Sequence, residues 1–201
     1  MNAIDILLQF VAGKIDAKEF ENELCTNEEL SHLLQDSTLD WTGTYIAKNL
    51  NLYYYLIELN YSRLEDKVNA IGALELFFKK KGVVYSISNK DTELYELLLA
   101  TQPKYIDIES SFFEKYILPT DKNLSKTELK QLIKDNFSKY FKYQNKPPKW
   151  VQNPAWIVHN DKPLFFIGQL ELKIDAFHDN GFVYVFIDTE TGEFEIVKQF
   201  Y

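Results

Sequence analysis

The sequence FVYVFIDTETGEFEIVKQF, residues 182–200, decides the fold class of this 201-residue chain. The unbroken apolar run from Phe182 to Ile187 is typical of a buried strand, and Phe194 to Phe200 is typical of a returning partner. Glu190, Thr191, Gly192 and Glu193 form a turn between the two runs. The stretch therefore predicts an antiparallel hairpin at the C-terminal end of the sequence.

Outward from this hairpin, residues 164–172 predict one more strand, whereas the earlier residues show helical spacing of apolar positions. No proline precedes Pro103, which permits long helices in the first half. Helix starts are indicated by Asp16, Thr26, Ser62 and Ser125, each followed three residues later by a glutamate. We expect an α+β fold, with an N-terminal α-helical bundle and a small antiparallel sheet. Residues 1–145 form the helical region and 146–201 the β region, packed together as one compact unit.

The composition excludes several classes of protein. With 22 basic and 30 acidic residues the net charge is −8, which argues against a general nucleic-acid binder. The single Cys25 cannot form an internal disulfide, and no apolar run approaches the roughly 18 residues of a membrane span. We therefore expect a cytoplasmic protein that binds neither nucleic acid nor membrane.

Motifs that carry catalysis are absent from the sequence. It contains no phosphate-binding glycine loop, no dinucleotide fingerprint, no HExxH and no paired CxxC. We expect no enzyme activity, no cofactor and no metal. The alternative is a small hydrolase in which His178 acts as a base oriented by Asp175 or Asp179, although a polar turn before Gly181 explains these residues more simply.

The residues that favour binding are mostly acidic. Residues 1–40 carry a net charge of −7 and residues 151–201 a net charge of −5. A negative rim on the terminal sheet would attract a basic protein partner, and its candidate residues are Glu171, Asp175, Asp179, Asp188, Glu190 and Glu193. Tyr54 is a further candidate anchor, because three successive tyrosines in a helix cannot all face one core.

Two stretches resemble a known family. They are Ile6 to Ile15 followed by Phe20-Glu21, and Pro147 to Trp156 continued by Gly168-Gln169. Together they resemble small bacterial immunity proteins of polymorphic toxins, including those of contact-dependent growth inhibition systems. The resemblance implies that the chain binds one cognate toxin domain, and we expect the tryptophans of the second stretch to pack against the sheet.

The sequence therefore predicts an immunity protein that neutralises a cognate toxin, with a basic nuclease as the expected class. The mechanism would be stoichiometric occlusion of the active site or the substrate surface of the toxin. The alternative is a general interaction adaptor with no toxin partner. The oligomeric state is not predicted.

Overall fold

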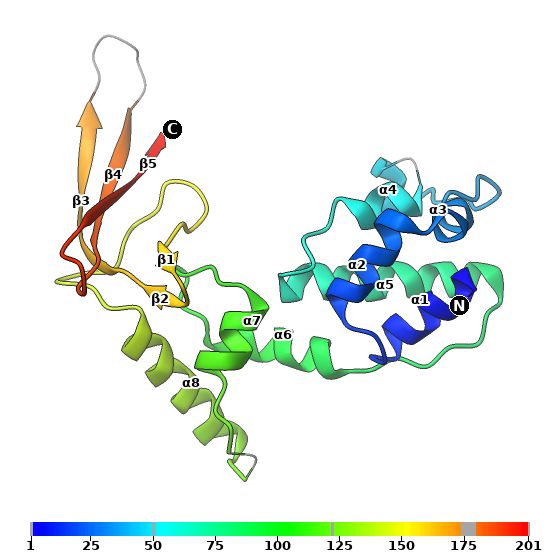
Figure 1. Ribbon diagram of the computed structural model, residues 1–201, viewed down its shortest axis with the longest axis horizontal. Coiled ribbons are helices and arrows are strands. Elements are labelled where there is room, and N and C mark those ends of the chain that lie inside the picture. Colours follow the sequence, from blue (N-terminus) through cyan, green and yellow to red (C-terminus); the bar gives the residue numbers. More distant parts are fainter. Residues whose placement is uncertain (1, 50, 122, 174–179, 201) are drawn as a thin grey trace. The chain divides into compact units, whose positions relative to one another are not determined.

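The chain folds into two compact units, residues 1–97 and 98–201 (Figure 1). The computed structural model describes residues 2–49, 51–121, 123–173 and 180–200. Helices come first and an antiparallel sheet follows, so the predicted α+β class is confirmed. The division between the units lies within helix α6 (Lys90–Thr101), so residues 98–145 belong to the same unit as the sheet, whereas the predicted change of region lay after residue 145.

The first unit is helical in its described part. Its elements are α1 (Ala3–Val11), α2 (Ala17–Thr26), α3 (Glu28–Leu34), the 3-10 helix η1 (Tyr45–Asn49), α4 (Leu52–Ile57), α5 (Leu64–Lys81) and the start of α6. An aromatic cluster fixes α1 against α2, since the rings of Phe10 and Phe20 stack with centroids 3.9 Å apart. Tyr61 meets both rings edge-on, which is a favourable arrangement for aromatic quadrupoles.

Two of the predicted helix starts are confirmed. The carboxylate of Asp16 accepts the Glu19 amide at 2.8 Å at the start of α2. Ser125 and Glu128 form a reciprocal capping box at the start of α8 (Lys126–Tyr140). Both arrangements satisfy amides that have no partner within the helix.

The other two predicted starts are wrong. The cap of α3 is Asn27, whose side chain accepts an amide of the first turn, because Thr26 still belongs to α2 and its hydroxyl donates to the Asn22 carbonyl. The hydroxyl of Ser62 donates to the Asn60 side chain at 2.7 Å instead of capping α5. In both cases the hydroxyl donates to a nearby acceptor on the chain, and this bond competes with capping of the helix.

The second unit combines helical segments with the antiparallel sheet. After α6 come α7 (Ser110–Phe112), the π-helix η2 (Phe113–Ile117) and α8, followed by β1 (Val158–His159), β2 (Lys162–Pro163), β3 (Phe165–Lys173), β4 (Asn180–Ile187) and β5 (Phe194–Phe200). The strand order is β3-β4-β5, antiparallel throughout, so the predicted terminal hairpin is confirmed. The short β1–β2 hairpin was not predicted, and it turns through Asn160 and Asp161 at φ 48° and 63°.

One face of the sheet is covered by the segment that precedes β1. The Trp150 ring lies 4.3 Å from the Tyr184 ring, and the Trp156 ring lies 5.5 Å from the Phe186 ring. The indole N–H of Trp156 donates to the Leu164 carbonyl at 2.9 Å. The expectation that these tryptophans pack against the sheet is confirmed, and we call this covered side the inner face.

Candidate functional site

The acidic side chains around the β4–β5 turn are engaged within the second unit. The Asp188 carboxylate accepts the amides of Glu190 at 2.8 Å and Thr191 at 3.3 Å. The bond from the Glu190 amide holds the pKa of Asp188 below its usual value. Asp188 therefore stabilises the turn in its ionised form, in addition to any role on the surface.

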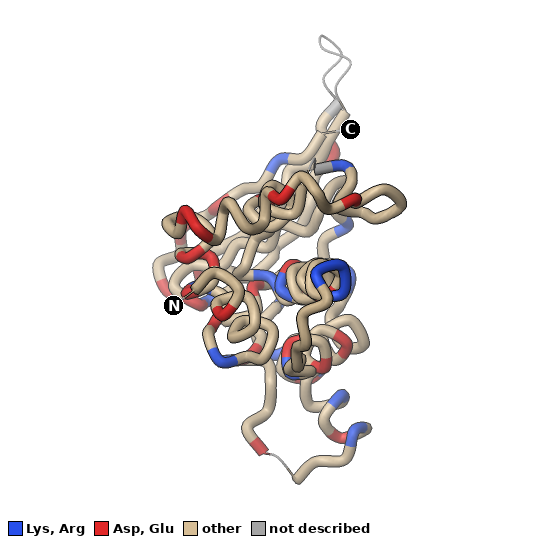
Figure 2. Tube along the Cα trace, turned by 90° about the vertical axis from the view of Figure 1, so that its right-hand side faces the viewer, with Lys and Arg blue, Asp and Glu red and all other residues tan. Residues whose placement is uncertain are grey.

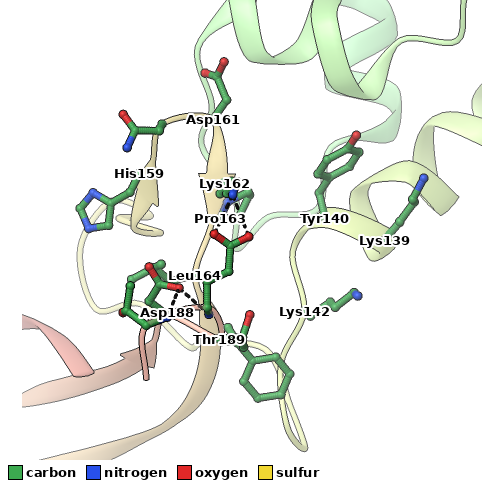
Figure 3. Close-up of a pocket in the computed structure, with 14 residues that line it drawn as sticks. Lys139, Tyr140, Lys142, His159, Asp161, Lys162, Pro163, Leu164, Asp188 and Thr189 are labelled. Atoms are coloured by element: carbon green, nitrogen blue, oxygen red, sulfur yellow. Dashed lines mark hydrogen bonds and ion pairs between the residues drawn. The ribbon is translucent and has the colours of Figure 1, made fainter. Parts of the chain in front are cut away.

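Two neighbouring carboxylates contact side chains of the β1–β2 hairpin. Glu190 binds the Lys162 ammonium through both of its oxygens at 2.7 Å (Figure 3). Glu195 lies 2.6 Å from the Nε2 atom of His159. Both contacts join the β1–β2 hairpin to the end of the sheet. The Lys162 ammonium also compensates part of the negative charge expected on this rim.

The remaining predicted residues are more dispersed. Glu171 is exposed on β3, and Glu193 is exposed in the turn before β5. Tyr54 lies in the first unit, on α4, where its side chain is 45% exposed and meets Tyr53 edge-on. Asp175, Asp179 and His178 lie outside the described residues. The structure thus brings Asp188 and Glu190 together, whereas Tyr54 belongs to a different unit.

A polar pocket of about 680 Å³ opens beside the β1–β2 hairpin (Figure 3). Lys139, Tyr140 and Lys142 line one side of it, and the hairpin and the β4–β5 turn line the other. Asp161 at the hairpin tip accepts hydrogen bonds from Lys115 at 2.9 Å and from the Tyr116 hydroxyl at 2.8 Å. Opposite charges therefore meet around much of this pocket and leave it polar and close to neutral.

Across the described residues, no three His, Cys, Asp or Glu side chains converge in a way that could hold a metal ion. Within the same part of the chain, no helix has the length and apolar character needed to cross a bilayer.

The side of the sheet opposite the tryptophans is apolar and exposed, and we call it the outer face. The cross-strand register places Leu170, Phe194, Ile196 and Phe200 on this face. Their side chains are 65%, 65%, 52% and 40% exposed. Three partly buried residues of β4 lie between them: Val183, Val185 and Ile187. Such a contiguous apolar surface is typical of a site that another molecule covers.

Charge is nearly absent from the outer face. In the described residues of β3, β4 and β5, the register assigns one charged side chain to it, the exposed Lys198 opposite Val183. Glu171 and Glu195 belong to the inner side, because they stand opposite Phe182 and Phe186. The predicted acidic residues that the structure describes therefore do not occupy the outer face.

Strand β5 has its polarity reversed. Its inward side carries Glu195, Val197 and Gln199, so two of three residues are polar, whereas three of the four residues on its outward side are apolar: Phe194, Ile196 and Phe200, with Lys198 as the fourth. A half-covered antiparallel strand ordinarily turns its apolar side inward and its polar side toward water. This reversal is the feature that distinguishes the outer face from an ordinary solvated sheet surface.

The sequence alone did not reveal this site, although it contains a signal. Along residues 194–200, apolar side chains occupy every second position except 198, and the residues between them include Glu195 and Gln199. A half-covered strand that buried its apolar side would turn Phe194, Ile196 and Phe200 toward the inner face. The opposite orientation follows only once Gln199 is known to bind the segment beneath the sheet.

Comparison with known proteins identified no relative: no family model, no curated protein and no solved structure matches this chain.

Proposed function

We propose that this chain is an immunity protein that binds a cognate bacterial toxin and neutralises it by stoichiometric occlusion. The observation that carries the proposal is the outer face, on which four large apolar side chains are between 40% and 65% exposed. Fully burying one such side chain stabilises a complex by roughly 1.5–3 kcal/mol. Protein partners commonly anchor on a surface of this kind.

Charge supports a basic partner. The first unit holds sixteen acidic and nine basic residues, a net charge of −7, and the second holds fourteen and thirteen, a net charge of −1. Acidic positions are drawn in red in Figure 2: α1 carries Asp5, α2 carries Glu19, Glu21 and Glu23, and α3 carries Glu28 and Glu29. A field of this sign accelerates association with a nuclease that carries a basic substrate cleft.

The resemblance to immunity proteins agrees with this proposal. Its two stretches fall on α1 with the start of α2, and on the segment that packs under the sheet. Both stretches contribute to the fold, since they supply core and covering residues. The surfaces that would meet the toxin lie elsewhere, as expected if the partner differs from one member of such a group to another.

Co-expression with the toxin domain encoded by the preceding gene tests the proposal. We expect a one-to-one complex that survives purification and protects the producing cells. Phe194→Ser should abolish protection, whereas Leu99→Ser on α6 should not, although Leu99 is 64% exposed and Phe194 65% exposed. Absence of a complex with the wild-type chain would contradict the proposal and favour an adaptor with another partner.

A further inference from the structure

The free edge of strand β5 differs from the opposite edge of the sheet. The β3 edge is partly occupied, because Phe166 bonds through its amide to Lys142 and through its carbonyl to Gln144. Strand β5 is paired only with β4 within the described residues. Its edge therefore leaves a row of backbone donors and acceptors open for another strand.

The hydrogen-bond register identifies the open groups. The Asp188 amide donates to the Glu193 carbonyl, which makes this pair a bonded one. Bonded and non-bonded pairs alternate along an antiparallel ladder, so the N–H and C=O groups of Phe194, Ile196 and Lys198 face away from β4. The next outward carbonyl, that of Phe200, accepts the Gln152 side chain at 2.8 Å, which ends the open stretch.

The open backbone groups and the exposed side chains belong to the same residues. Phe194 and Ile196 present their side chains on the outer face and their peptide groups at its edge. An extended segment that paired with β5 would bond to these groups and extend the apolar face by one strand. Its alternate side chains would pack beside Phe194 and Ile196, which is the geometry of strand addition.

Charge determines what the added segment should contain. Lys198 is exposed at the edge and is the one charged side chain that the described strands place on the outer face. Opposite charges on neighbouring strands stabilise their pairing, and like charges oppose it. The matching segment therefore carries apolar side chains on one side and a carboxylate beside Lys198.

We propose that the free edge of β5 accepts an extended segment of the partner as a fourth strand, with apolar residues against Phe194 and Ile196 and a carboxylate beside Lys198. This inference rests on the proposed function for the identity of the partner, because the segment would belong to the toxin. It also specifies that recognition includes main-chain hydrogen bonds at this edge.

Proline substitution separates backbone pairing from side-chain contact. Ile196→Pro removes an amide that faces away from β4, and proline is tolerated at such edge positions. We expect it to weaken toxin binding at least ten-fold more than Ile196→Ala, which retains the amide. Val197→Pro removes an amide that faces β4 and should unfold the sheet. Unfolding of this variant would confirm the register. Equal affinity of the Ile196→Pro and Ile196→Ala variants would overturn strand addition while leaving the proposed function intact.

A peptide tests the edge without the toxin. The probe is a ten-residue peptide that alternates valine and threonine, with one glutamate placed to meet Lys198. In titrations of the isotope-labelled full chain, we expect shifts of the Ile196 and Lys198 amide resonances that Lys198→Glu reduces at least three-fold. Shifts confined to Leu170, or none, would overturn the proposal. A dimer of the chain alone that Ile196→Pro dissociates would assign the edge to a second copy and also overturn it.

Discussion

Gln199 and Phe200 are adjacent in β5, yet the polar side chain is 5% exposed and the aromatic one 40% exposed. Gln199 accepts the amides of Val151 and Gln152, both at 3.1 Å, and donates to the Asn153 carbonyl at 2.8 Å. These bonds tie the tryptophan-bearing segment to the inner face. They also require β5 to present its apolar side chains on the outer face.

The first prediction concerns this glutamine. Gln199→Leu should destabilise the protein by roughly 2–4 kcal/mol, because the Gln152 amide loses its Gln199 acceptor and the Asn153 carbonyl its Gln199 donor, while the Val151 amide retains the Tyr184 hydroxyl. Gln152→Ala, which removes one exposed bond to the Phe200 carbonyl, should cost only about 0.5 kcal/mol. Urea unfolding monitored by tryptophan fluorescence measures both. Equal midpoints for the two variants would show that Gln199 does not fix this strand.

The second prediction compares two glycines of the sheet. A Cβ atom at Gly181 would collide with the Gln199 carbonyl and lie 2.8 Å from Cδ1 of Phe200, whereas one at Gly168 would meet nothing within 4 Å. Gly181→Ala should therefore destabilise the protein by roughly 1–3 kcal/mol. Gly168→Ala should change stability by no more than about 0.5 kcal/mol. Thermal unfolding of both variants tests the β4–β5 register, and an unaffected Gly181→Ala would argue against it.

The third prediction concerns the hairpin beside the polar pocket. Hydrogen bonds from Lys115 and Tyr116 hold the pKa of the Asp161 carboxyl below its ordinary value of 3.8. A lowered pKa in the folded state means that ionised Asp161 stabilises the fold above that ordinary value. The contribution disappears as the pH falls through the folded pKa.

Asp161→Asn provides the test, since asparagine tolerates the positive φ of 63° at this position. We expect the variant to have a slightly lower Tm than the wild type at neutral pH. The difference between the two Tm values should shrink as the pH falls below 3.8. Calorimetry of the wild type and the variant from neutral to acidic pH measures the difference. A gap that stays constant over the whole range would mean that the ion pair contributes nothing.

The fourth prediction separates the outer face from the core. A double variant with Phe194→Ser and Ile196→Thr should change the free energy of unfolding by no more than about 0.5 kcal/mol, because these exposed side chains add little to the isolated fold. The same variant should be more soluble, since it removes apolar surface. Denaturant unfolding and solubility measurements check both. A loss of several kcal/mol would place these residues in the core instead.

Much of the fold could be predicted from the sequence, because its signals are local. The apolar run at 182–187, the glycine turn and the proline-free helical half all act over a few residues, as do the caps at Asp16 and Ser125. The caps expected at Thr26 and Ser62 failed because a competing acceptor lay within four residues. Spacing alone does not reveal which of two nearby acceptors a hydroxyl will use.

The candidate site was harder to predict, because it depends on long-range contacts. The sequence indicated a free negative rim near β5, whereas Glu190 and Glu195 contact Lys162 and His159, which lie 28 and 36 residues earlier in the chain. The orientation of β5 depends on Gln199 reaching the segment near Val151. No local pattern encodes either contact.

The most direct test of the account is calorimetry of the chain with its proposed partner, a toxin domain encoded by a neighbouring gene, to measure the dissociation constant of the complex. We predict one-to-one binding that the double variant with Phe194→Ser and Ile196→Thr weakens at least a hundred-fold, while Leu132→Ser on α8, at a residue that is 40% exposed, leaves the affinity unchanged. Unchanged affinity in the double variant would contradict the claim that the outer face is the binding surface.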